Sequence, residues 1–113
     1  MPQTQQYQEC IEACRECATA CLQCASACLL EEDVKSLTRC IQLDLECATL
    51  CHAAAQVMSM NGELSEQLCQ LCESICKSCA QECEDHIEME HCRKCAEACS
   101  RCAEVCAHMV QHA

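Results

Sequence analysis

Residues 10–28 read CIEACRECATACLQCASAC, and the spacing of the cysteines in this stretch sets the architecture of the chain. Successive cysteines are separated by 4, 3, 4, 3 and 4 residues. An α-helix turns once in about 3.6 residues, so these steps return each side chain to one face. The stretch therefore predicts a helix with a continuous cysteine stripe, formed by Cys10, Cys14, Cys17, Cys21, Cys24 and Cys28.

The same spacing returns in three later segments. Their stripes consist of Cys69, Cys72, Cys76, Cys79 and Cys83, of Cys92, Cys95, Cys99, Cys102 and Cys106, and of a thinner set, Cys40, Cys47 and Cys51. We expect helices over residues 4–30, 34–60, 63–85 and 88–111. Because short turns join antiparallel neighbours, the sequence predicts an all-α fold, an up-down-up-down four-helix bundle in a single domain over residues 1–113.

Residues between the stripes support these boundaries. An acidic stretch at 31–33 separates the first two helices, and Asn61 with Gly62 is a typical C-terminal cap after the second. Asp85, with Glu88 three residues later, predicts an N-terminal cap for the fourth helix.

Apolar residues flank the cysteine stripes, and polar residues oppose them. On the first helix the flanks are Ile11, Ala13, Ala18, Ala20, Ala25 and Ala27. Flanks of this kind seal neighbouring helices together, which leaves the cysteines pointing at the bundle axis. Leu22, Leu29 and Leu45 interrupt the polar face and predict self-association.

Composition excludes several classes of function. The formal charge is −11, from 18 acidic and 7 basic residues without a basic run, which argues against a nucleic-acid or anionic-membrane partner. The N-terminus shows no leader pattern, and no stretch approaches the roughly 20 apolar residues of a membrane span, so we expect a soluble, cytoplasmic protein. A reducing cytosol keeps thiols free, and the odd number of cysteines, 19, also fits poorly with complete disulfide pairing.

Three chemical uses of these cysteines compete. Cysteine packs as a small hydrophobe at isolated positions, but an all-cysteine core specifies packing poorly. Disulfides between residues three or four apart on one helix would distort it. Metal binding remains, with Cu(I), Zn(II), Cd(II) or an iron–sulfur cluster as the soft candidates. Four unshared thiolates leave a formal charge of −2 on each Zn(II) site, whereas thiolates that bridge Cu(I) ions one to one are neutral, so a buried array favours Cu(I).

Repeated Cys-x-x-x-Cys and Cys-x-x-Cys steps on four expected helices, with Tyr7 as the one aromatic residue, resemble the bacterial copper storage proteins, specifically their cytosolic branch. The resemblance covers essentially the whole chain. It implies a four-helix bundle that binds many Cu(I) ions along its core and assembles as a homotetramer. In that family, histidines just before the first cysteine of the last helix are associated with copper uptake at one mouth of the bundle. The matching residues here are His86, which continues the cysteine spacing, and Met89 and His91 beside it.

Asp44 occupies a stripe position where a cysteine is expected, and the resembling family carries an acidic residue in the same Asp-x-x-Cys step. We therefore expect Asp44 to point inward and to ligate or orient copper; the alternative is a half-turn shift that leaves Asp44 solvated and Leu43 inside. At the other end Met58 and Met109 share the stripe phase with Tyr7 and predict a hydrophobic plug. The histidines that fall off the stripes, and are expected on the surface, are His52, His108 and His112.

The leading hypothesis is a storage protein that holds multiple Cu(I) ions, with the 19 cysteines, Asp44, His86, Met89 and His91 as candidate ligands. Nothing in the sequence indicates turnover of a substrate, so we expect no enzyme. The expected partners are copper ions, with a copper chaperone as a candidate donor. The alternatives are metallothionein-like sequestration of Zn(II) or Cd(II), a thiol redox buffer, and a purely structural protein.

Overall fold

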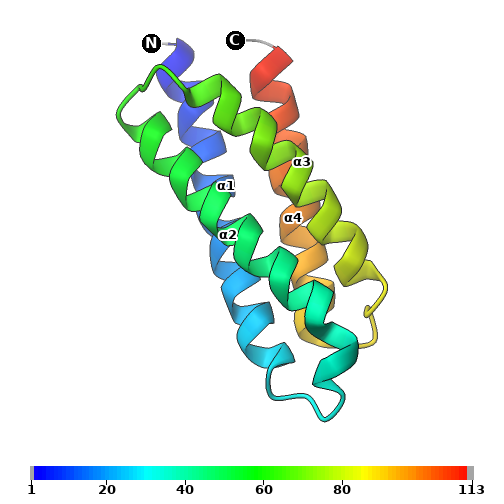
Figure 1. Cartoon of the computed structure of the whole chain (residues 1–113). Coiled ribbons are helices and arrows are strands. Elements are labelled where there is room, and N and C mark those ends of the chain that lie inside the picture. The colour runs from blue at the N-terminus through cyan, green and yellow to red at the C-terminus, as the bar shows by residue number, and fades with distance from the viewer. Residues whose placement is uncertain (1, 112–113) are drawn as a thin grey trace.

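The cysteine stripes fold into helices that run side by side along one long axis, as the computed structural model of the chain shows (Figure 1). The structure describes residues 2–111 and the side chains of residues 7–109. Its elements are α1 (Pro2–Cys28), η1 (Val34–Leu37, a single 3-10 turn), α2 (Thr38–Ser59), α3 (Ser65–Glu84) and α4 (Glu90–Gln111). The bundle measures 49 × 18 × 17 Å. The predicted all-α four-helix bundle is confirmed.

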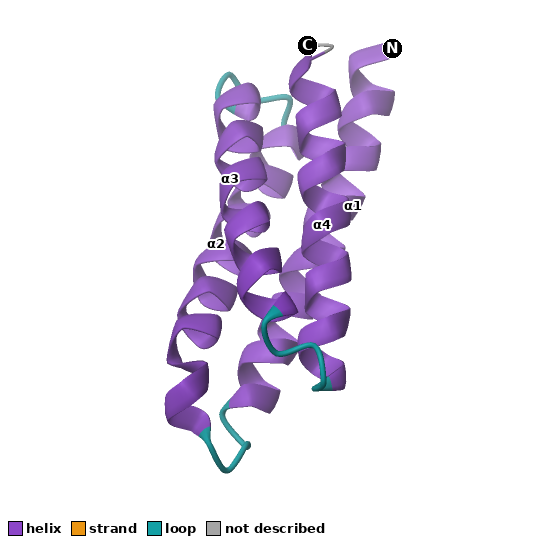
Figure 2. Cartoon of the chain, turned by 90° about the vertical axis from the view of Figure 1, so that its right-hand side faces the viewer, coloured by secondary structure: helices purple, strands orange, loops and turns teal. Residues whose placement is uncertain are grey.

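The two ends of the bundle differ in what connects there. α1 packs on α2 and α4, and α3 packs on the same two helices. The N-terminus, the C-terminal end of α4 and the α2–α3 turn lie at one end, which we call the closed end (Figure 1). The connections at residues 29–37 and 85–89 lie at the other end, which we call the mouth, and Figure 2 shows the described loops confined to these ends. Neighbouring helices are therefore antiparallel, as the short turns predicted.

The C-terminal cap predicted after the second helix is confirmed. Asn61 adopts a left-handed backbone with φ of 54°. Its N–H donates to the carbonyl of Met58 at 3.0 Å, and the N–H of Gly62 donates to the carbonyl of Val57 at 2.9 Å. These two bonds satisfy carbonyls that the end of α2 would otherwise leave unpaired, in the pattern of a Schellman motif.

The cap predicted for the fourth helix is wrong. Asp85 has helical backbone angles, φ −69° and ψ −11°, and ends α3. An N-cap residue normally leaves the helical region, and here tight turns continue instead, with the N–H of His86 donating to the carbonyl of Cys83 at 3.0 Å. α4 begins at Glu90, two residues after the predicted start. The first helix likewise ends at Cys28 and not at residue 30, because three-residue turns follow it.

The core consists mainly of thiols. All 19 cysteines are free and buried. The flanking residues Ile11, Ala18 and Leu43 are buried beside them, so the apolar flanks do seal the helix contacts. Leu22, Leu29 and Leu45 remain exposed on this chain. Among the described residues, no helix is long and apolar enough to cross a membrane.

Candidate metal centre

The antiparallel register brings one cysteine from each helix into a common layer. In the central layer Cys17 (α1), Cys47 (α2), Cys76 (α3) and Cys99 (α4) meet on the axis. The Sγ atom of Cys17 lies 3.8 Å from that of Cys47, 3.8 Å from that of Cys76 and 3.6 Å from that of Cys99. A tetrahedral metal ion with metal–sulfur bonds of about 2.3 Å holds its sulfurs about 3.8 Å apart. Each of these three sulfur pairs is thus already spaced like two ligands of one metal ion.

Such layers follow one another without a break. Cys17 and Cys47 belong both to a group with Cys21 and Cys99 and to a group with Cys51 and Cys76, and within each group all ligand atoms lie within 4.8 Å of one another. Neighbouring sulfurs are 3.5 to 4.0 Å apart from the mouth to the closed end. Because the groups share members, the array suits thiolates that bridge two ions better than isolated four-cysteine sites. We call it the thiol array.

Asp44 lies inside the thiol array. The side chain is fully buried, at 0% exposure, and its Oδ1 accepts hydrogen bonds from the thiols of Cys79 and Cys95, both at 3.2 Å. The inward orientation predicted for Asp44 is therefore correct, and the solvated alternative is wrong. Burial, reinforced by the nearby cysteines Cys95 and Cys79, raises the pKa of Asp44 far above its ordinary value. The metal-free structure therefore favours the neutral carboxyl.

His91 is the histidine that the structure brings to the thiols. Its Nδ1 lies 3.5 Å from the sulfur of Cys92 and 3.7 Å from the sulfurs of both Cys24 and Cys28. Its Nε2 lies 2.9 Å from Oε2 of Glu31, in the α1–α2 connection. A carboxylate only accepts hydrogen bonds, so the imidazole nitrogen that faces Glu31 must carry the proton. Glu31 therefore selects the Nε2–H tautomer, and the Nδ1 lone pair faces three sulfurs.

A route from solvent reaches this group. A surface depression of about 380 Å³ between α1 and α4 is lined by Cys24 and His91. Met89 is half-buried in the α3–α4 connection and packs against the core. His86 points elsewhere: its Nε2 pairs with Oε2 of Glu82 at 3.1 Å on α3. Within the described residues, His91 faces the thiols and His86 faces Glu82.

Burial keeps two of the mouth thiols, Cys28 and Cys92, protonated. It raises the pKa of Cys28 to about 11, and it likewise raises the pKa of Cys92 above the ordinary thiol range. At pH 7 these side chains are neutral thiols. A soft cation that binds them must therefore displace their protons.

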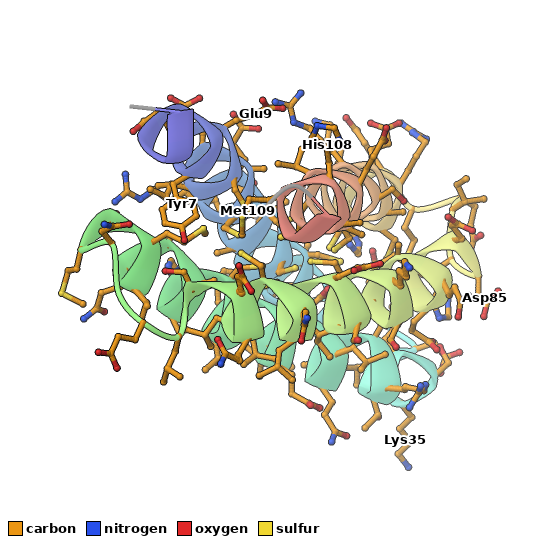
Figure 3. All side chains as sticks on the ribbon, turned by 90° about the horizontal axis from the view of Figure 1, so that it is seen from above. Tyr7, Glu9, Lys35, Asp85, His108 and Met109 are labelled. Carbon is orange, nitrogen blue, oxygen red and sulfur yellow. The ribbon has the colours of Figure 1, made fainter. Side chains whose placement is uncertain are left out.

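The closed end is sealed by larger side chains. Tyr7, Met58 and Met109 are buried there, and Figure 3 shows Tyr7 and Met109 on the sides of α1 and α4 that face the other helices. The predicted plug is thus in place. Of the histidines expected on the surface, His52 and His108 are exposed, and His112 lies outside the described residues.

Sequence reasoning missed Glu31 as part of the site. We interpreted the acidic stretch at 31–33 as a separator between helices, whereas Glu31 reaches across the mouth to His91. The available signal was an acidic residue just after Cys28, the last cysteine of its stripe, in a chain whose mouth also carries a histidine. Local spacing does not tell which of Glu31, Glu32 and Asp33 makes the contact.

Comparison with known proteins assigns the chain to a class. The family model of the copper storage proteins, Csp, matches residues 3–111, nearly the whole length. The chain therefore belongs to the copper storage protein family. No curated protein matches it.

Three solved structures illustrate the likeness. A cytosolic copper storage protein from Streptomyces lividans, loaded with five coppers, is 40% identical over 96% of this chain and 95% of its own, with a TM-score of 0.91. The Cu(I)-bound copper storage protein BsCsp3 is 41% identical over 93% of this chain and 98% of its own, with a TM-score of 0.89. Apo copper storage protein 3 from Bacillus subtilis is 42% identical over 91% of this chain and 97% of its own, with a TM-score of 0.86.

Proposed function

We propose that this protein stores Cu(I) on cysteine thiolates inside its four-helix bundle. The observation that carries the proposal is the unbroken thiol array, in which every cysteine is buried and neighbouring sulfurs lie 3.5 to 4.0 Å apart. The relatives support the same cargo, since one is Cu(I)-bound and another is loaded with ten copper equivalents.

Charge balance favours Cu(I) over Zn(II). Four thiolates around each Zn(II) leave a formal charge of −2, and several such sites along a narrow core would accumulate charge that the −11 chain does not offset. One Cu(I) per bridging thiolate leaves the core neutral. The shared groups, such as those joined by Cys17 and Cys47, allow this bridging.

The array is suited to holding ions rather than to turnover. A thiol oxidoreductase needs an exposed, low-pKa cysteine and a resolving partner, whereas here no cysteine is exposed and many are equivalent by position. We infer that the protein is not an enzyme. Its ions enter at the mouth, where Cys24, Cys28, Cys92 and His91 form the first group, with Met89 and His86 as outer, transient ligands.

The relatives and the surface support proposals on cellular location and on assembly. The Streptomyces lividans protein is cytosolic, and we propose the same compartment for this chain. We also propose that the exposed leucines, of which Leu29 is 60% exposed, are covered in a homotetramer. Light scattering of the reduced apo-protein tests this, and a monomer at micromolar concentration would contradict it.

The deciding experiment is an anaerobic titration of the reduced apo-protein with Cu(I) against a competing chelator. A parallel titration uses Zn(II), and circular dichroism is recorded before and after loading. We expect tight uptake that approaches one ion per cysteine on a chain already helical without metal. Uptake of only a few ions of either metal, with folding on binding, would contradict storage and support zinc sequestration.

A further inference from the structure

The last cysteine layer before the closed end is incomplete. Cys10 (α1), Cys69 (α3) and Cys106 (α4) form it, with sulfur separations of 3.5 Å from Cys10 to Cys106 and 3.8 Å from Cys10 to Cys69. Cys47 on α2 faces Cys76 on α3, with 3.6 Å between their sulfurs. Because the two helices are antiparallel, the residue seven positions after Cys47 faces the residue seven positions before Cys76. Ala54 therefore faces Cys69. α2 thus contributes a methyl group where the other helices contribute sulfur. We call the three cysteines the terminal triad.

Met58 fills the position that Ala54 leaves open. Cα–Cβ bonds tilt toward the N-terminus of a helix, so the side chain of Met58 leans back over Ala54, one turn earlier, and into the array. Its Sδ accepts a hydrogen bond from the thiol of Cys69 at 3.5 Å, the same separation as between two sulfurs of the terminal triad. Met58 is 2% exposed, so this thioether meets the triad in the absence of solvent.

We propose that the Sδ atom of Met58 is a Cu(I) ligand and that, together with the terminal triad, it forms the last site of the thiol array at the closed end. The proposal rests on Cu(I) as the cargo. Ions elsewhere in the array can share thiolates with layers on both sides, but an ion here has thiols on one side only. A thioether is a soft ligand that completes its coordination without adding negative charge or releasing a proton.

Met109 provides a matched comparison at the same end. It is equally buried, at 2% exposure, and it follows Cys106 on its own stripe. Its helix already supplies a sulfur to the terminal triad through Cys106. We therefore assign Met109 to the hydrophobic plug, and the Met109→Leu variant should bind copper as the parent protein does.

Selenomethionine gives a direct test, because a selenium absorption spectrum reports copper bonded to a methionine. The Met89→Leu background removes the methionine at the mouth. In this background, fully Cu(I)-loaded selenomethionine protein should show a copper neighbour at bonding distance from selenium. Adding Met58→Leu should abolish that signal, whereas adding Met109→Leu should not.

The copper titration supplies an independent readout. Leucine retains the size of Met58 but lacks sulfur, so Met58→Leu should lose about one tightly bound equivalent, or bind one equivalent about tenfold more weakly. Full uptake by the parent protein with no selenium–copper signal would overturn the proposal while leaving storage intact. No copper uptake by the parent protein would overturn both.

Discussion

Asp44 is a single carboxyl placed among thiols, and its burial has an energetic cost in the metal-free protein. Its pKa is raised in the folded state, so folding is favoured below the unfolded pKa of about 4 and this contribution is lost as pH rises. Asn cannot ionise, yet it keeps an oxygen for the thiols of Cys79 and Cys95. We expect Asp44→Asn to stabilise the reduced apo-protein at pH 7 by at least about 1.4 kcal/mol, the equivalent of one pKa unit.

Urea unfolding of the two proteins at pH 4 and pH 7 measures this difference. The gain should be present at pH 7 and shrink to about 0.4 kcal/mol at pH 4, where the Asp44 carboxyl is protonated in the folded state and about half protonated in the unfolded state. A gain of equal size at pH 4 and pH 7 would show that packing, and not ionisation, causes the difference in stability between the parent protein and the variant.

We expect Glu31 to act on copper through His91, whose Nε2 it contacts at 2.9 Å. Removing its carboxylate in Glu31→Ala frees the imidazole to change tautomer and to rotate away from Cys24 and Cys92. Loss of a hydrogen-bonding partner behind a metal ligand weakens metal binding by about tenfold or more, so the affinity for the first Cu(I) should fall by that order. Nitrogen NMR of the apo-protein should show Nε2–H in the parent protein and a tautomer mixture in the variant.

Glu31→Gln is the matched control, because its amide oxygen still accepts the Nε2–H hydrogen bond. It should retain the tautomer and most of the affinity. If Glu31→Ala leaves both the nitrogen spectrum and the copper affinity unchanged, Glu31 does not orient His91.

At the scale of the element, the end of α2 depends on a close approach of backbone to side chain. A Cβ added at Gly62 would lie 2.6 Å from Cγ1 of Val57 and 3.1 Å from its carbonyl oxygen. Val57 is β-branched and moves little, so Gly62→Ala should lower the free energy of unfolding by about 1–3 kcal/mol. Thermal unfolding of the apo-protein measures the loss. The double variant with Val57→Ala should recover part of it, and no recovery would place the strain on the carbonyl oxygen instead.

The helices could be predicted because steps of three and four are a geometric property of an α-helix, and the same phase placed Asp44 inside. The boundary at Asp85 could not be predicted. An acidic residue with Glu88 three positions later fits the start of α4 as well as the end of α3. The Glu31–His91 contact depends on the path of two connections that meet only in the folded bundle. Ligation by Asp44, His86, Met89 and His91 stays a prediction.

For the whole molecule, copper uptake is also an exchange of protons. Burial raises the pKa of Cys28 to about 11, so this thiol is protonated in the apo-protein at neutral pH. Each bound Cu(I) should release about one proton per thiolate formed, and affinity should rise about tenfold per pH unit between pH 6 and pH 8. Titration in weakly buffered solution counts the protons. Release far below one per ion would mean that the thiols are already ionised.

The seal formed by Tyr7 and Met109 at the closed end gives the stored ions an order of arrival. Among the described side chains, the hollow at Cys24 and His91 gives solvent access to the array at the mouth, so we expect the first ion admitted to move furthest from the mouth and the latest to stay nearest to it. When a chelator draws copper out, the most recent arrivals leave first. Protein loaded with one copper isotope and then with the other should release the second isotope to the chelator before the first. The order of release is then the reverse of the order of loading.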